Sequence, residues 1–112
     1  MNMKDEMQWA TDLLAKYPKT KGLMEQWAKG ELVDMQTTMM AEVADKTDIV
    51  VPEITDEMAS QYAMVILAAN QYAVLDFLDS QKQYVNLTIN ETSNRKVLTK
   101  SAIEVGFESL NN

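Results

Sequence analysis

The sequence contains no cysteine and no histidine among its 112 residues. Without these residues the chain cannot build a Ser-His-Asp triad, a Cys-His pair, a disulfide, or a zinc site of thiolate and imidazole ligands. Its three glycines, Gly22, Gly30 and Gly106, lie too far apart for a P-loop or a G-x-G-x-x-G turn. The commonest catalytic and cofactor-binding motifs are therefore excluded, and we predict that the protein is not an enzyme and holds no cofactor.

Carboxylates are the remaining groups that could support chemistry. They occur in three groups along the chain: Asp45 with Asp48, Asp76 with Asp79, and Glu53 with Asp56 and Glu57. Such groups can bind Mg²⁺ or Ca²⁺ or act as acid and base, but none has the spacing of an EF-hand. Because acidic side chains are mostly exposed, we interpret these groups as solvated helix ends. A carboxylate-only enzyme or divalent-metal protein stays an alternative, and no metal site is assigned.

Positive charge is scarce. Ten lysines and arginines face seventeen acidic residues, which gives a net charge of −7, and Arg95 is the single arginine. Nucleic-acid binding depends on Lys and Arg contacts to phosphates and base edges, so we expect no direct nucleic-acid binding. The acidity leaves a second function open: an inhibitor, encoded by a virus or a mobile element, that occupies a basic nucleic-acid-binding groove of a target protein.

The longest uncharged stretch, MASQYAMVILAANQYAVL, covers residues 58–75. Its length approaches that of a membrane span, but four polar side chains interrupt it and acidic residues flank it on both sides. The first residues carry acidic groups where a secretory signal would be basic. We therefore expect no membrane insertion and predict a soluble protein of the cytoplasm.

Three stretches have the apolar spacing of amphipathic helices. Pro18 ends the first, Thr20 is a candidate cap of the second, and Gly30 breaks or weakens the second. Thr55 is the candidate N-cap of the third, with acidic residues in its first turn. We expect one globular domain over residues 1–112, built as a compact bundle of three main helices. These helices are expected at about residues 3–17, 20–45 and 55–82.

The pattern changes after the third helix. Val85, Leu87 and Ile89 alternate with polar residues, and Ile103 and Phe107 belong to a second alternating run. We predict a small C-terminal β-hairpin over residues 84–108, which makes the fold class mainly α with an α+β character. The second run also allows a helix, so an all-α four-helix bundle is the alternative.

Asn70 interrupts the apolar face of the third helix, between Ala63 and Phe77. A polar group in such a position needs a hydrogen-bond partner if it is buried. We predict that Asn70 is buried and hydrogen-bonded, fixing the helix register or an oligomer contact.

Methionine is abundant, with nine residues, eight of which lie in the three expected helices. Methionine fills irregular gaps in cores, and it also forms adaptable binding surfaces. Two features favour a surface: two adjacent methionines that cannot share one narrow helix face, and a second apolar strip on the third helix. We therefore predict a protein-binding or assembly module whose partner is another protein or a second copy in a homo-oligomer. The predicted partner-binding residues are Met39, Met40, Met64, Ala68, Tyr72 and Leu75.

Overall fold

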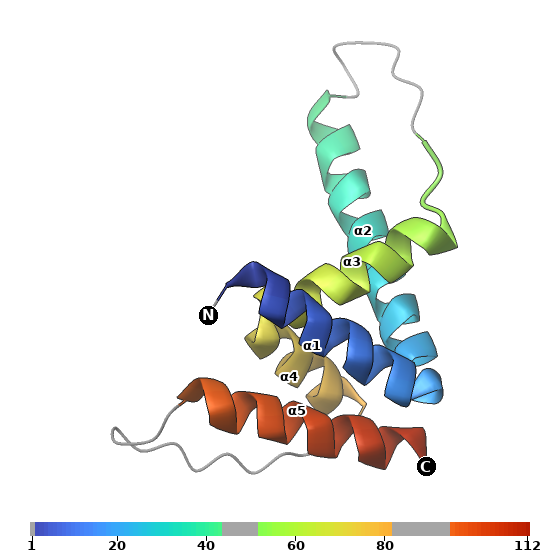
Figure 1. The fold of residues 1–112 in the computed structure, drawn as a ribbon. Coiled ribbons are helices and arrows are strands. Elements are labelled where there is room, and N and C mark those ends of the chain that lie inside the picture. Colours follow the sequence, from blue (N-terminus) through green and yellow to red (C-terminus); the bar gives the residue numbers. More distant parts are fainter. Residues whose placement is uncertain (1, 44–51, 82–94) are drawn as a thin grey trace.

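The computed structural model describes residues 2–43, 52–81 and 95–112, and five helices account for most of them. The helices follow each other without an intervening strand in these ranges, and each of them contributes side chains to one core. Figure 1 shows their arrangement. In chain order the helices are α1 (Met3–Lys16), α2 (Pro18–Val43), α3 (Asp56–Ala69), α4 (Gln71–Ser80) and α5 (Arg95–Asn111).

The predicted C-terminal hairpin is wrong, because α5 occupies the second half of its range. Ile103 and Phe107 are fully buried, whereas Val105 between them is 62% exposed. A strand would place these three side chains on one face, while residues four apart share a face of a helix. The expected first strand, residues 84–90, lies outside the described residues. The four-helix alternative also differs, since the described residues form five helices.

The first two helices meet at a sharp junction. Tyr17 ends α1 with a non-helical backbone, and Pro18 is the first residue of α2, a position where its fixed φ angle and missing N–H are tolerated. Thr20 does not cap α2 as predicted. It is buried, and its hydroxyl donates to the Phe107 carbonyl of α5 at 2.7 Å. The cap comes from the other end of the chain, because Asn111 Oδ1 accepts from the Lys19 N–H at 2.9 Å.

The predicted third helix is divided at Asn70 into α3 and α4. The Asn70 backbone is non-helical, with φ −137° and ψ 74°, and its side-chain oxygen accepts from the Ala73 N–H at 3.3 Å. Asn70 is exposed, so its predicted burial and its proposed register role are wrong. Its hydrogen bond instead caps α4. The predicted cap at the start of α3 is confirmed, since the Thr55 side chain accepts from the Met58 N–H.

The core lies where α1, the N-terminal half of α2, α3, α4 and α5 converge. Its largest fully buried side chains come from four of these helices: Met24, Leu67, Phe77 and Phe107 are all shielded from solvent. Trp27 of α2 packs a tilted ring against Phe77, with the ring centroids 5.3 Å apart. Each helix therefore contributes its apolar face to one shared interior, as expected for amphipathic helices.

The molecule is longer in one direction than in the other two, with extents of 52 × 32 × 30 Å. Figure 1 shows why: the C-terminal half of α2 continues beyond the helices that surround its first half. Gly30 does not break the helix, which runs continuously from Pro18 to Val43.

Candidate functional site

The part of α2 that leaves the body is the first feature of interest, and we call residues 31–43 the α2 arm. The three buried residues of α2 are Thr20, Met24 and Ala28, and all of them precede the arm. A 26-residue helix thus has one half packed in the core and one half without a buried side chain.

The apolar face of α2 continues into the arm without a change of direction. Beyond Met24 and Ala28, steps of three and four residues lead to Leu32, Met35, Met39 and Val43, which we call the arm stripe. At about 100° per residue these side chains lie within roughly 100° of Met24 around the helix. Met35 is 43% exposed and Met39 66% exposed, whereas Met24 and Ala28 are fully buried. The stripe that builds the core therefore extends onto the surface.

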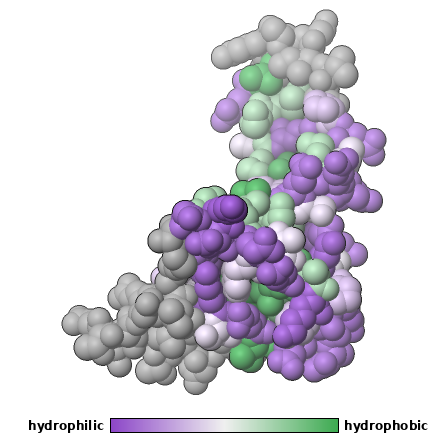
Figure 2. Space-filling view, in the orientation of Figure 1, coloured by the Kyte–Doolittle hydropathy of each residue, from purple (hydrophilic) through white to green (hydrophobic). Residues whose placement is uncertain are grey.

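The space-filling view shows hydrophobic atoms at the surface of the projecting part (Figure 2). On the projecting part of the molecule, green hydrophobic atoms form a column beside purple hydrophilic ones (Figure 2). Leu32 and Val43 are half-buried at the ends of the stripe, and Met35 and Met39 are the open part between them.

One edge of the arm stripe is held by the chain itself. Gln36 Nε2 donates to the Pro52 carbonyl at 2.7 Å, which places the segment before α3 alongside the arm. At the base of the arm, Lys29 Nζ and Asp56 Oδ1 form an ion pair of 2.9 Å. The hydrogen bond and charge of Asp56 raise the pKa of Lys29, and those of Lys29 lower the pKa of Asp56. On a helical projection Gln36 and Lys29 lie on the same side of α2.

The opposite edge of the stripe carries only acidic charge. Glu31, Asp34 and Glu42 are exposed and lie on the side of the stripe away from Gln36. From Gly30 to Val43 the chain has these three carboxylates and no basic residue. The site is thus an apolar, methionine-rich strip with one closed edge and one open, acidic edge.

The six predicted partner-binding residues do not form one surface. Met39 and Met40 lie on the α2 arm, and Tyr72 and Leu75 lie on α4 in the body of the molecule (Figure 1). Ala68 is only 5% exposed, so it offers no surface to a partner. Met64 and Leu75 are half-buried and pack against the core. Tyr72, at 59% exposure, is the one exposed residue among the four binding residues predicted on the third helix.

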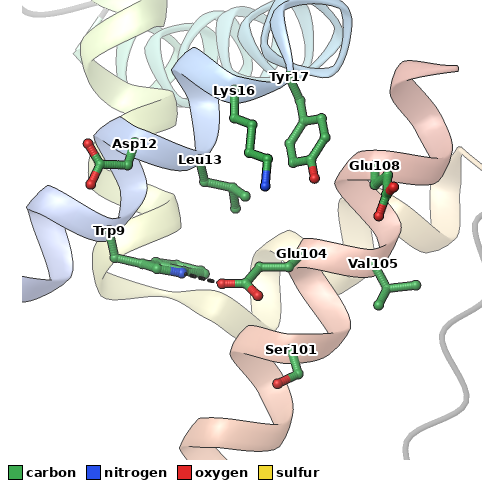
Figure 3. A pocket seen from close by; sticks show the side chains of 9 residues that line it. All are labelled: Trp9, Asp12, Leu13, Lys16, Tyr17, Ser101, Glu104, Val105 and Glu108. Carbon is green, nitrogen blue, oxygen red and sulfur yellow. Dashed lines mark hydrogen bonds between the residues drawn. The ribbon is translucent and has the colours of Figure 1, made fainter.

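The second feature of interest is a concave surface between α1 and α5. It is a groove of about 430 Å³ into which side chains of both helices project (Figure 3). Trp9 donates from Nε1 to Glu104 Oε1 at 2.9 Å, and Lys16 Nζ lies 5.5 Å from the centroid of the Tyr17 ring. These polar and aromatic groups already interact with one another. We therefore interpret the groove as part of the contact between α1 and α5 and assign no ligand to it.

Sequence reasoning did not find the buried charge at the junction of α1, α4 and α5. Glu6 is 4% exposed and accepts from Lys100 Nζ and from Gln71 Nε2, each at 3.0 Å. Lys100 also lies 5.0 Å from the centroid of the Trp9 ring, where a cation–π contact is favourable. The local sequence around Glu6 does not predict its burial, because its partners are 65 and 94 residues away in the chain.

The described ranges contain no group of three or more acidic side chains arranged to hold a metal ion. Asp45 and Asp48 lie outside those ranges. Within the same residues, none of the helices combines the length and the hydropathy that a membrane span requires.

Comparisons of the chain with protein-family models, with curated proteins and with solved structures give no match.

Proposed function

We propose that this chain is a non-catalytic protein-binding module that takes a helical segment of another protein on the arm stripe. The observation that carries the proposal is the continuation of one apolar face from the core, where it is buried, onto the arm, where Met35 and Met39 are exposed. Inside the protein this face packs against other helices, so a helix is the natural partner outside it.

The energetics support a binding role for these side chains. Fully burying a methionine side chain is worth about 1.5–3 kcal/mol relative to leaving it in water. Because Met35 and Met39 are exposed, folding gains only part of this free energy from them. Binding of a partner that covers both side chains would gain the remainder. Methionine also adjusts its shape to irregular partners, which suits a surface that is not matched in advance to one set of side chains.

A pull-down from the source cells tests the proposal with a matched control. The double variant Met35→Ser/Met39→Ser removes the open part of the stripe, while Met3→Ser changes a comparably exposed methionine (55%) on α1. We expect a partner protein to be retained by the wild type and by Met3→Ser and lost by the double variant. All three proteins should melt at similar temperatures, because surface substitutions usually change stability by less than about 0.5 kcal/mol.

If the double variant retained the same proteins, the arm would not be part of the binding surface and the proposal would be wrong. The mass in solution, measured by light scattering on the same samples, checks self-association. A mass of two chains for the wild type, reduced to one chain by the double variant, would show that the partner is a second copy.

A further inference from the structure

We infer that the partner helix is basic: an amphipathic helix whose apolar stripe is bordered by lysine or arginine. The inference rests on the proposed function, because it names the chemistry of what the arm stripe would bind. The two edges of the stripe differ in charge and in accessibility.

The closed edge is unavailable to a partner's charges. Lys29, the basic residue nearest to the arm on α2, is already paired with Asp56 at 2.9 Å, and Gln36 is bonded to the Pro52 carbonyl. A partner helix lying on Met35 and Met39 must therefore approach from the open edge. There it meets Glu31, Asp34 and Glu42, all of them exposed.

The charge of that edge discriminates between partners. A second copy would bring its own acidic edge against the first, and like charges in proximity disfavour association. An apolar helix with acidic flanks would suffer the same repulsion. A helix with Lys or Arg on its flanks would instead gain attraction and a faster encounter, both of which weaken with salt.

The size of the stripe sets the length of the partner segment. From Leu32 to Val43 a helix rises about 16 Å at 1.5 Å per residue, which is roughly three turns. A partner segment of about 12 residues, with apolar side chains at steps of three and four, covers that length.

Three synthetic helical peptides with the same leucine stripe and different flanks test the inference. The flanking positions are lysine in the first, serine in the second and glutamate in the third. Each is titrated into the full chain and followed by calorimetry and by NMR of ¹³C-labelled methionine methyl groups. We expect the lysine peptide to bind most tightly, to shift the Met35 and Met39 methyl signals, and to bind more weakly as salt is added.

A charge-neutral variant of the protein supplies the control. Glu31→Gln/Asp34→Asn/Glu42→Gln keeps the stripe and removes the acidic edge. Each exposed ion pair strengthens binding only modestly, so we expect the loss of three carboxylates to weaken binding of the lysine peptide about tenfold and to leave binding of the serine peptide unchanged.

The outcomes separate the two proposals. If the serine peptide binds as tightly as the lysine peptide and shifts the same methyl signals, the arm binds helices but the inferred basic chemistry is wrong. If no peptide shifts these signals, both the proposed function and the inference fail. If the methyl signals shift with protein concentration alone and the mass doubles, the occupant is a second copy and the basic helix is overturned.

Discussion

At the scale of single residues, burial differs sharply between neighbours in the sequence. Ile66 is 7% exposed and belongs to the core, while the preceding Val65 is 46% exposed. The helical spacing of the third predicted helix places Ile66 on the apolar face, and the structure agrees. The same spacing could not predict that Asn70 is exposed, because one helix ends there and another begins. The Asn70 side-chain oxygen accepts from the Ala73 N–H at the start of the second helix.

The two neighbours give a direct test of this face. Ile66→Asp would bury an uncompensated carboxylate, which costs on the order of 3 kcal/mol or more. Val65→Asp places the same charge in solvent and should change the free energy of unfolding by less than about 0.5 kcal/mol. Urea denaturation of both variants measures the difference. Similar midpoints for the two would show that α3 is rotated from the orientation described.

The ion pair at the base of the arm predicts a dependence on pH. Folding lowers the pKa of Asp56 below the ordinary 3.8, so its contribution to stability is present above that value and is lost as the pH falls through the lowered pKa. Folding raises the pKa of Lys29 above 10.5, so its contribution is present below that value and is lost at higher pH. The pair therefore stabilises the protein between these limits.

Asp56→Asn should lower the melting temperature at neutral pH by a small amount, because the Asp56 side chain is 94% exposed and screened by water. The difference from the wild type should shrink as the pH falls below 3.8 and through the lowered pKa of Asp56, because the wild-type carboxylate then becomes neutral like the asparagine. Melting curves across the acid range check this, and a constant difference at every pH would exclude the ion pair as its cause.

At the scale of the helices, the sequence predicts most of the α-helical segments and misses what joins them. The C-terminal alternation resembled a strand because Ile103, Val105 and Phe107 are all apolar, and only packing reveals that Val105 faces solvent. The N-terminal cap of α2 and the ion pair of Glu6 involve residues about 90 positions apart. Local patterns carry no information about such contacts.

Replacing a glycine with alanine tests how closely two helices approach. A Cβ atom at Gly106 would lie 2.7 Å from Leu78 Cδ1, and Leu78 is fully buried in the core. A Cβ atom at Gly22 of α2 would meet nothing within 4 Å. Gly22→Ala should therefore stabilise the protein by about 0.5–1 kcal/mol through helix propensity.

Gly106→Ala should destabilise the protein, because overpacking a core costs about 1–3 kcal/mol and outweighs the same gain in propensity. Thermal or urea unfolding of the two alanine variants compares them directly. Stabilisation by both substitutions would mean that α4 and α5 can separate at little cost.

At the scale of the whole molecule, the defining feature is a helix that belongs to the core in one half and leaves it in the other. The abundance of methionine indicated a binding surface from the sequence, and Met39 does lie on an exposed face. The sequence could not separate Met24 from Met35, since both follow the same helical spacing. The other helices cover Met24 but leave Met35 exposed. This tertiary packing, and not the spacing, makes one a core residue and the other a surface residue.

The most direct test of the central claim is photo-crosslinking from position 39. A photoreactive phenylalanine analogue replaces Met39 in one protein and Met3 in a control, and both are irradiated in extracts of the source cells. The account predicts that position 39 crosslinks to one partner protein and position 3 does not. Crosslinks from position 39 only to this chain's own body, or equal crosslinking from both positions, would contradict it.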